Sequence, residues 1–267
     1  MNYFFIQKKP DELADIFISC VLTEIEQYPC MGLVSKINNG CHKDMDYKLF
    51  KKSSLAIENL LKDIIKNIDK IKDFNDLKKI GYKNEKEMFL LTKNINTHKG
   101  LIFCTSVYFY CLLKFKPKDL KSHIKNISLL CKNIKKEYGK SQSIGDELYR
   151  KYKILGAKYQ AYKGYKIIYK ALNYYHLNIV KKDIDKSLKL FLLLGYISIK
   201  IKDTTLINKI GLKKYKLYKK KIKILLCSYK EEEIYNFNKW CIENNASPGG
   251  SADIFVLLLF TNMIVIN

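Results

Sequence analysis

The chain has 267 residues, with 49 lysines and arginines against 26 aspartates and glutamates, and carries a net charge of +23 at pH 7. Hydrophobic residues make up 48% of the chain, which excludes a disordered protein, and only 4 prolines and 12 glycines argue against a turn-rich β-sandwich or barrel. The longest apolar runs, such as residues 254–260, fall well short of the roughly 18 residues that span a bilayer, and the first ten residues lack the charged start of a signal peptide.

The chain contains 8 cysteines and 4 histidines, and no two cysteines are spaced Cys-x-x-Cys. That spacing is the usual sign of a structural zinc site, so a zinc ribbon is excluded. Because no secretory signal precedes them, we expect reduced thiols in a cytoplasmic protein, most of them small apolar residues of the core.

Most of the positive charge comes from lysines spread along the chain at helical spacing, which is typical of solvated helix faces. The densest run, residues 213–223, interleaves its lysines with aromatic and aliphatic residues, as one exposed face of a helix would. A positive field also attracts nucleic acids and polyphosphates, so the charge by itself does not choose a partner.

Apolar residues recur at helical spacing nearly throughout, without strand-like alternation, repeats or a flexible linker. We therefore expect an all-α protein, a single domain over residues 1–267 built as an irregular multi-helix bundle. The stretch from Leu101 to Phe115 is apolar on all sides and predicts a central buried helix. Further helical patterns cover residues 146–152, 157–175, 185–200, 212–226, 231–244 and 251–266.

Four expected helices begin with recognisable signals. Pro10 precedes two acidic residues, which suits a first helical turn, and Asp46 and Asp119 stand where side chains cap helices. The stretch from Asn84 to Glu87 has the first residue and the acidic third position of a capping box, so it predicts a helix start at Asn84.

Three short polar segments, each just before an expected helix, fit neither a helix face nor an ordinary loop. They are residues 32–46, 94–100 and 246–253. The third contains Pro-Gly-Gly-Ser, in which the glycines leave the backbone accessible and the helix start offers partial positive charge to a phosphate. A simple turn would also explain this stretch.

The other two segments supply further groups that bind anions and cations. Thr97, His98 and Lys99 offer a hydroxyl, an imidazole and an ammonium group to anionic oxygens. Three aspartates carry the hard oxygen ligands that Mg²⁺ prefers: Asp44, Asp46 and Asp253. Each group has a structural alternative, since Asp46 can cap a helix and His98 can be a hydrogen-bonded core residue. The joint occurrence of the three segments at helix starts favours a binding site.

The same segments carry a family resemblance. Residues 38–46 read Asn-Asn-Gly-Cys-His-Lys-Asp-Met-Asp, residues 96–100 read Asn-Thr-His-Lys-Gly, and residues 247–253 read Ser-Pro-Gly-Gly-Ser-Ala-Asp. This combination, in this order, resembles the triphosphoribosyl-dephospho-CoA synthases, which make the precursor of the prosthetic group of citrate lyase and malonate decarboxylase. The resemblance extends over nearly the whole chain.

The resemblance implies a transferase with ATP and 3′-dephospho-CoA as substrates. A ribose 2′-hydroxyl of dephospho-CoA would attack the anomeric carbon of the ATP ribose, adenine would leave, and 2′-(5″-triphosphoribosyl)-3′-dephospho-CoA would form. Such glycosyl transfer passes through an oxocarbenium-like transition state and needs a clamp for the triphosphate and a base for the hydroxyl. A downstream enzyme that forms holo-citrate lyase would be its partner, and neither a membrane nor a nucleic acid is expected to bind.

Under this hypothesis each segment has a role. The catalytic residues would be Asp44, Asp46 and His42, with His42 or a nearby aspartate as the base. The substrates and their phosphates would be bound by Asn38, Asn39, Asn96, Thr97, His98, Lys99, Gly249, Gly250 and Ser251. Mg²⁺ would be the cofactor, held by Asp44, Asp46 and Asp253.

Several positions depart from the family pattern. Ser35 replaces an aspartate, Gln160 replaces a glutamate, and two histidines are replaced, by Ile144 and Asn208; a glutamate and an arginine are also replaced by residues of the same charge, Asp146 and Lys158. Since isoleucine cannot move a proton, two interpretations stay open: a divergent but active synthase, or a degenerate paralogue that binds a nucleotide without turnover. A third, a basic nucleic-acid-binding protein, leaves residues 247–253 unexplained.

Overall fold

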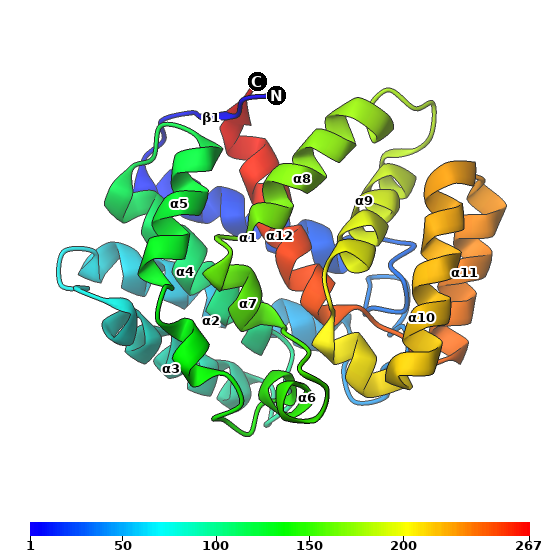
Figure 1. The fold of residues 1–267 in the computed structure, drawn as a ribbon, viewed down its shortest axis with the longest axis horizontal. Coiled ribbons are helices and arrows are strands. Elements are labelled where there is room, and N and C mark those ends of the chain that lie inside the picture. The colour runs from blue at the N-terminus through cyan, green and yellow to red at the C-terminus, as the bar shows by residue number, and fades with distance from the viewer.

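A computed structural model describes all residues, 1–267, and almost all regular structure in it is helical (Figure 1). The helices in chain order are α1 (Pro10–Glu26), α2 (Tyr47–Asn67), α3 (Phe74–Leu91), α4 (Lys99–Phe115), α5 (Leu120–Leu130), the 3₁₀-helix η1 (Ile134–Glu137), α6 (Ile144–Tyr152), α7 (Ala157–Tyr162), α8 (Lys166–Tyr174), the π-helix η2 (Tyr175–Ile179), α9 (Lys186–Lys200), α10 (Thr204–Ser228), α11 (Glu231–Glu243) and α12 (Gly249–Ile264). The buried apolar residues form one continuous core, so the predicted all-α, single-domain architecture is confirmed.

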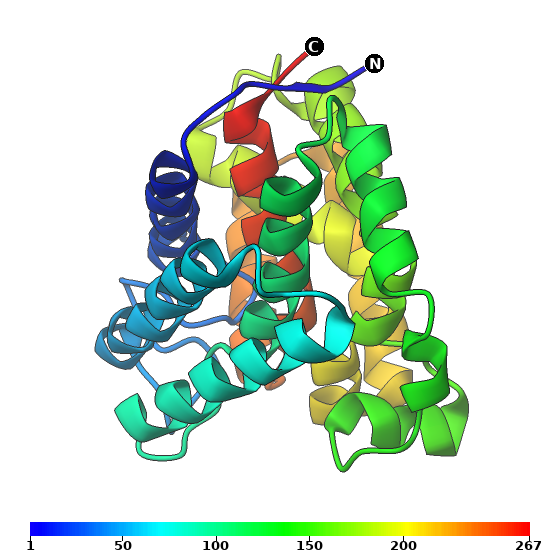
Figure 2. The ribbon, with the colours of Figure 1, turned by 90° about the vertical axis from the view of Figure 1, so that its left-hand side faces the viewer.

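The two ends of the chain form the one small sheet. The strands β1 (Phe4–Phe5) and β2 (Val265–Ile266) pair antiparallel, and Figures 1 and 2 show the two termini side by side. The last expected helix, over residues 251–266, therefore ends at Ile264, because the next two residues extend to pair with β1.

Two apolar helices make the centre of the molecule. Helix α4 is the predicted central helix and is buried along most of its length, and α12 packs against α1, α4, α8, α9 and α10 (Figure 1). The hydroxyl groups of Tyr108 and Thr261 join α4 to α12 at 2.6 Å inside the core. No helix combines the length and the apolar character that a membrane crossing requires. Residues at the starts of both helices line one cavity.

The predicted helix starts are mostly confirmed. Pro10 is the first residue of α1, the Asp46 side chain accepts the Leu49 amide at 2.8 Å, and Asp119 forms a capping box with Ser122. The predicted start at Asn84 is wrong.

Helix α3 begins ten residues before Asn84, at Phe74. The carboxylate of Asp73 caps it by accepting the amides of Asn75 and Asp76 at 2.8 and 3.1 Å. Asn84 lies fully buried inside the helix, where its amide group donates to Asp63 of α2 at 3.0 Å. A tertiary contact therefore explains this polar residue, which the sequence pattern attributed to a helix end.

Two backbone breaks also differ from the predicted helix bounds. The pattern over residues 157–175 is divided into α7 and α8 because Gly164 and Tyr165 adopt left-handed conformations, with φ of 65° and 53°. Helix α10 begins at Thr204, before the expected residue 212, and bends at Gly211, whose φ is 71°. The bend turns the first part of α10 toward the start of α12.

Candidate active site

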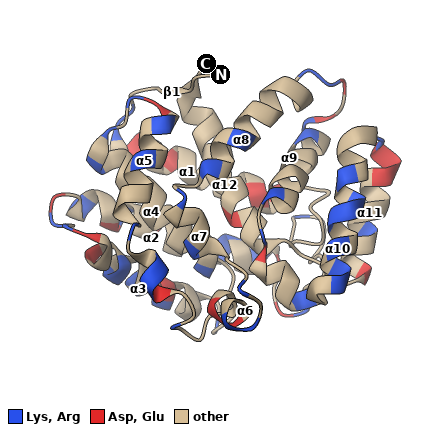
Figure 3. Cartoon of the chain, viewed as in Figure 1, with Lys and Arg blue, Asp and Glu red and all other residues tan.

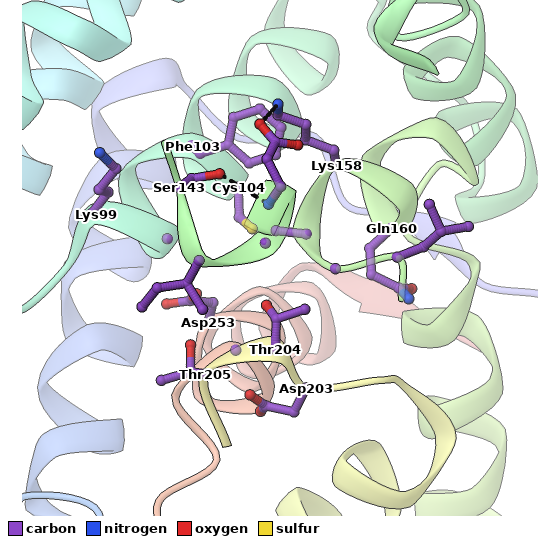
Figure 4. A pocket seen from close by; sticks show the side chains of 18 of the residues that line it. Lys99, Phe103, Cys104, Ser143, Lys158, Gln160, Asp203, Thr204, Thr205 and Asp253 are labelled. Carbon is purple, nitrogen blue, oxygen red and sulfur yellow. Dashed lines mark hydrogen bonds and ion pairs between the residues drawn. The ribbon is translucent and has the colours of Figure 1, made fainter. Parts of the chain in front are cut away.

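A cavity of about 500 Å³ lies where the starts of α4, α10 and α12 meet the segment from η1 to α7 (Figure 4). Two of the three polar segments contribute to its wall, Asn96 and Lys99 from the second and Gly250 and Asp253 from the third. Sequence reasoning assigned no site residue to the wall formed by residues 138–160, although it noted this stretch as a place of family resemblance.

Asp253 is a carboxylate of the cavity wall with no hydrogen bond or ion pair to the protein. It lies directly against the backbone of Gly100, where a Cβ atom would overlap its carboxylate. Burial raises the pKa of Asp253 well above its ordinary value, and the nearby charges of Asp203 and Glu24 raise it further. A cation in the cavity would stabilise the charged form of this side chain.

The start of α12 is already occupied by a carboxylate of the protein itself. Asp203, which is 1% exposed, accepts the amide and the hydroxyl of Ser251, each at 2.7 Å, and also the amide of Leu206 at 2.9 Å. The predicted phosphate contact is therefore not available at Ser251, and the Gly249 amide donates to the Ser247 carbonyl at 3.0 Å. Gly250 lines the cavity, and a phosphate contact there stays a prediction. The sequence analysis did not identify Asp203 as a cap. The available signal was the position of this aspartate directly before Thr204 and Thr205, where α10 begins.

The charge of Lys99 is matched within the protein. Its ammonium group lines the cavity but lies 2.6 Å from a carboxylate oxygen of Glu85 in α3. The Asn96 side chain accepts the Lys99 amide at 3.3 Å and so helps to begin α4. Glu85 therefore competes with a phosphate for the Lys99 charge.

His98 and Thr97 point away from the cavity. The His98 ring is 3% exposed, shares a hydrogen bond of 2.6 Å with the Ser53 hydroxyl and packs edge-on against Phe50. Burial lowers the pKa of His98 to about 4, so the ring is neutral at pH 7. The Thr97 hydroxyl is buried without a partner. In place of the predicted phosphate contact, the structure shows His98 as the hydrogen-bonded core residue that was its alternative.

The first polar segment lies mostly beside a different hollow. Asn39, Asp44 and Asp46 line a space of about 460 Å³. Lys93 and Ile95, from the connection between α3 and α4, line the same space. The Asp44 side chain is 62% exposed. One carboxylate oxygen of Asp46 accepts the Leu49 amide and so caps α2. The Asn38 side chain accepts the Gly40 amide at 2.9 Å and shapes the turn. The structure thus places Asp44 and Asp253 in separate spaces.

His42 connects the first segment to the third. Its ring lies 3.2 Å from the Ser247 hydroxyl, and Lys209 of α10 contacts both groups, at 3.1 Å from the ring and 2.7 Å from the hydroxyl. Burial and the charge of Lys209 lower the pKa of His42 to about 4, so this ring is also neutral at pH 7. A base role for His42 stays a prediction.

A Mg²⁺ site made from all three predicted aspartates is not formed. Asp44 and Asp46 lie in the second hollow and Asp253 in the cavity, and no three histidine, cysteine or acidic side chains gather closely enough to hold a metal ion. The wall does fit an ion held by one carboxylate and substrate phosphates, which is how proteins usually bind Mg²⁺, because Asp253 has no other partner.

The substituted family positions fall into two groups. Ile144 and Gln160 line the cavity, as do Asp146 and Lys158, which form an ion pair of 2.6 Å. Away from the cavity, Asn208 is exposed on α10, and the buried Ser35 hydroxyl accepts the amides of the turn after it. The two charged substitutions are therefore matched to each other, whereas Ile144 and Gln160 make the wall less charged.

Comparisons with known proteins agree with the resemblance. The family model described as ATP:dephospho-CoA triphosphoribosyl transferase matches residues 10–265. The chain is 28% identical to a probable 2-(5″-triphosphoribosyl)-3′-dephosphocoenzyme-A synthase of Streptococcus mutans, over 97% of this chain and 98% of that protein. It is 24% identical to the synthase of Haemophilus ducreyi, over 97% of this chain and 89% of the other. No solved structure matches significantly. With a match over nearly its whole length, the chain belongs to the ATP:dephospho-CoA triphosphoribosyl transferase family.

Proposed function

We propose that this protein transfers the triphosphoribosyl group of ATP to 3′-dephospho-CoA and releases adenine. The observation that carries the proposal is the family match over residues 10–265, joined to one cavity in which two of the three polar family segments meet. A new bond forms between the acceptor 2′-hydroxyl oxygen and the anomeric carbon of the ATP ribose. The bond from that carbon to adenine breaks, the hydroxyl proton is lost, and the triphosphate stays on the transferred sugar.

Asp253 is the residue that we place beside the reacting sugar. Its carboxylate is free of protein partners and faces the cavity from the second turn of α12 (Figure 4). Positive charge develops on the ribose as adenine departs, and a fixed carboxylate in a site with little water stabilises such charge strongly. Bound Mg²⁺ would neutralise part of the phosphate charge, with Asp253 as its protein ligand.

Release of adenine tests the proposal. We expect wild-type protein with ATP, MgCl₂ and dephospho-CoA to release adenine, detected by chromatography, and to release none without dephospho-CoA. The Asp253→Asn variant should lose roughly 100-fold or more of this activity, because it loses a preorganised charge. Asp69→Asn, at a side chain that is 96% exposed, is the matched control. Wild-type turnover by Asp253→Asn would remove this carboxylate from the mechanism.

A second candidate is a nucleotide-binding paralogue without turnover. It is favoured by one observation, that Ile144 and Gln160 replace two ionisable family residues on the wall of the same cavity. In that case ATP raises the melting temperature of the protein, as any ligand of the native state does, but no adenine is released. Adenine release that depends on dephospho-CoA would reject this candidate.

We also propose that the protein acts in the cytoplasm. ATP is abundant there and thiols stay reduced, and six of the eight cysteines are free thiols buried in the fold. The product would then pass to an enzyme that attaches it to an acyl carrier subunit of citrate lyase.

A further inference from the structure

The cavity that contains Asp253 offers little unmatched positive charge to a phosphate chain. Two of its three lysines are held in ion pairs of 2.6 Å by carboxylates of the protein, and the third, Lys202, is exposed. At the start of α12, the amide and the hydroxyl of Ser251 are taken by Asp203. Every phosphate of a nucleotide is charged, so one free lysine does not balance a di- or triphosphate.

The second hollow, in contrast, is lined by four lysines that no group of the protein matches. They come from three parts of the chain: Lys43 from the first polar segment, Lys48 and Lys52 from α2, and Lys93 from the connection between α3 and α4. None of the four takes part in an ion pair. Figure 3 shows lysines and arginines on most of the helices, so positive charge alone does not mark a site. Four unpaired lysines that line one space of about 460 Å³ are a more specific feature.

The lysines of the hollow outnumber its carboxylates. Two aspartates line the same space: one Asp46 oxygen accepts the Leu49 amide at 2.8 Å, and the Asp44 carboxylate lies 4.0 Å from the His42 ring. Four lysines and two aspartates leave the wall with a net charge of +2 at pH 7. Unmatched like charges around one concave space create a potential that attracts an anion.

The backbone at Lys93 places a lysine where glycine would be less strained. Lys93 lies just after the end of α3 with a left-handed φ of 53°, and Asn94 follows with a φ of 66°. Glycine is the usual residue at such a helix end, because a Cβ atom disfavours this conformation. The Asn94 amide donates to the Phe89 carbonyl at 2.8 Å and fixes the turn. The turn therefore keeps Lys93 on the wall of the hollow.

The hollow and the cavity border the same connection. Ile95 lines the hollow, and the next residue, Asn96, lines the cavity. Neighbouring Cα atoms are about 3.8 Å apart. A phosphate chain in the hollow therefore lies beside the space in which we place the reacting sugar.

We propose that the second hollow binds the phosphate chain of a substrate through Lys43, Lys48, Lys52 and Lys93. The inference rests on the proposed function, which needs a clamp for phosphates. Two substrates carry such a chain, ATP as a triphosphate and dephospho-CoA as a diphosphate. Lysine ammonium groups form charge-assisted hydrogen bonds to phosphate oxygens, so four of them suit either chain.

The test compares two double variants that remove the same charge. Lys52→Met with Lys93→Met removes two lysines of the hollow, one from α2 and one from the connection, and keeps the side-chain length. Lys213→Met with Lys214→Met removes two exposed lysines of α10 and controls for the net charge. Binding of ATP, dephospho-CoA and inorganic tripolyphosphate is measured by calorimetry at fixed salt, and thermal unfolding checks that each variant is folded.

We expect the hollow variant to bind tripolyphosphate and one of the two nucleotides about tenfold or more weakly, and the control variant to stay within about twofold of wild type. A loss for ATP identifies the triphosphate as the bound chain, and a loss for dephospho-CoA identifies the diphosphate. Equal affinities in the two variants would overturn the inference, whether both bind as wild type does or both bind more weakly.

The release of adenine separates this inference from the proposed function. If the hollow variant alone loses phosphate binding but wild type releases no adenine, the proposed function fails and the phosphate site stands. If the hollow variant binds all three ligands and releases adenine as wild type does, the phosphate site fails and the proposed function stands.

Discussion

Gly100 shows how closely the starts of α4 and α12 approach each other. A Cβ atom at this position would overlap the carboxylate of Asp253, which itself has no hydrogen bond to hold it elsewhere. The absence of a side chain at Gly100 therefore lets the carboxylate lie against the backbone of α4. Sequence reasoning listed Gly100 as part of a motif, but the physical need for glycine became visible only with Asp253 beside it.

We expect Gly100→Ala to destabilise the protein by about 1 kcal/mol or more. Helix propensity alone would make alanine about 1 kcal/mol more stable at a helical site, so the sign of the change separates the two effects. Urea unfolding measures it. Gly145→Ala is the control, because its Cβ would meet the nearest heavy atom, the Thr204 hydroxyl oxygen, at 4.0 Å. A Gly100→Ala protein as stable as wild type would show that Asp253 can move aside without cost.

At the scale of elements, one carboxylate joins the starts of two helices. Asp203 caps α10 through the Leu206 amide and caps α12 through Ser251, although these helices begin 45 residues apart in the chain. The bend at Gly211 allows the first part of α10 to reach α12, while α10 also packs against α9 and α11. The geometry of the cavity therefore depends on a buried charge whose hydrogen bonds come from both helices.

Asp203→Ala is expected to lower the free energy of unfolding by about 3 kcal/mol, because it removes two caps and leaves a buried Ser251 amide and hydroxyl unpaired. Asp73→Ala is the comparison, since Asp73 caps only α3 and does so at the surface; its loss should cost about 1 kcal/mol. Equilibrium unfolding in urea provides both values. Similar losses for the two variants would mean that Asp203 acts as an ordinary cap.

For the whole molecule, burial in one core keeps the rings of His98 and His123 neutral. His123 is fully buried between Tyr108 and Phe5, and neither ring nitrogen has a hydrogen-bond partner. Burial lowers its pKa to about 3, so the native state keeps the ring neutral, whereas the unfolded chain takes up a proton below about pH 6.5. The contribution of this ring to stability is therefore complete at pH 7 and falls as the pH drops from about 6.5 toward 3.

Comparison with His123→Phe isolates this contribution, because all other titrating groups are common to both proteins. Between pH 7 and pH 5, wild type should lose about 2 kcal/mol more of its free energy of unfolding than the variant does. Chemical denaturation at the two pH values gives the difference. Parallel pH profiles would show that the ring is protonated in the native state or reaches water.

The sequence by itself determined the helices and the family. Periodicity along the chain predicted the all-α fold and the buried α4, because burial of an apolar face depends on spacing that is local in sequence. The motifs at residues 38–46, 96–100 and 247–253 indicated the family match, because motifs are also local.

Only the tertiary structure decided which polar groups stay available to bind a ligand. His98 is hydrogen-bonded to Ser53, Lys99 forms an ion pair with Glu85, and Ser251 is hydrogen-bonded to Asp203, while Asp253 and Lys202 have no such partner. The partners in these pairs lie 14 to 48 residues apart in the chain, and a polar side chain is satisfied by what folding brings beside it, which no local pattern encodes.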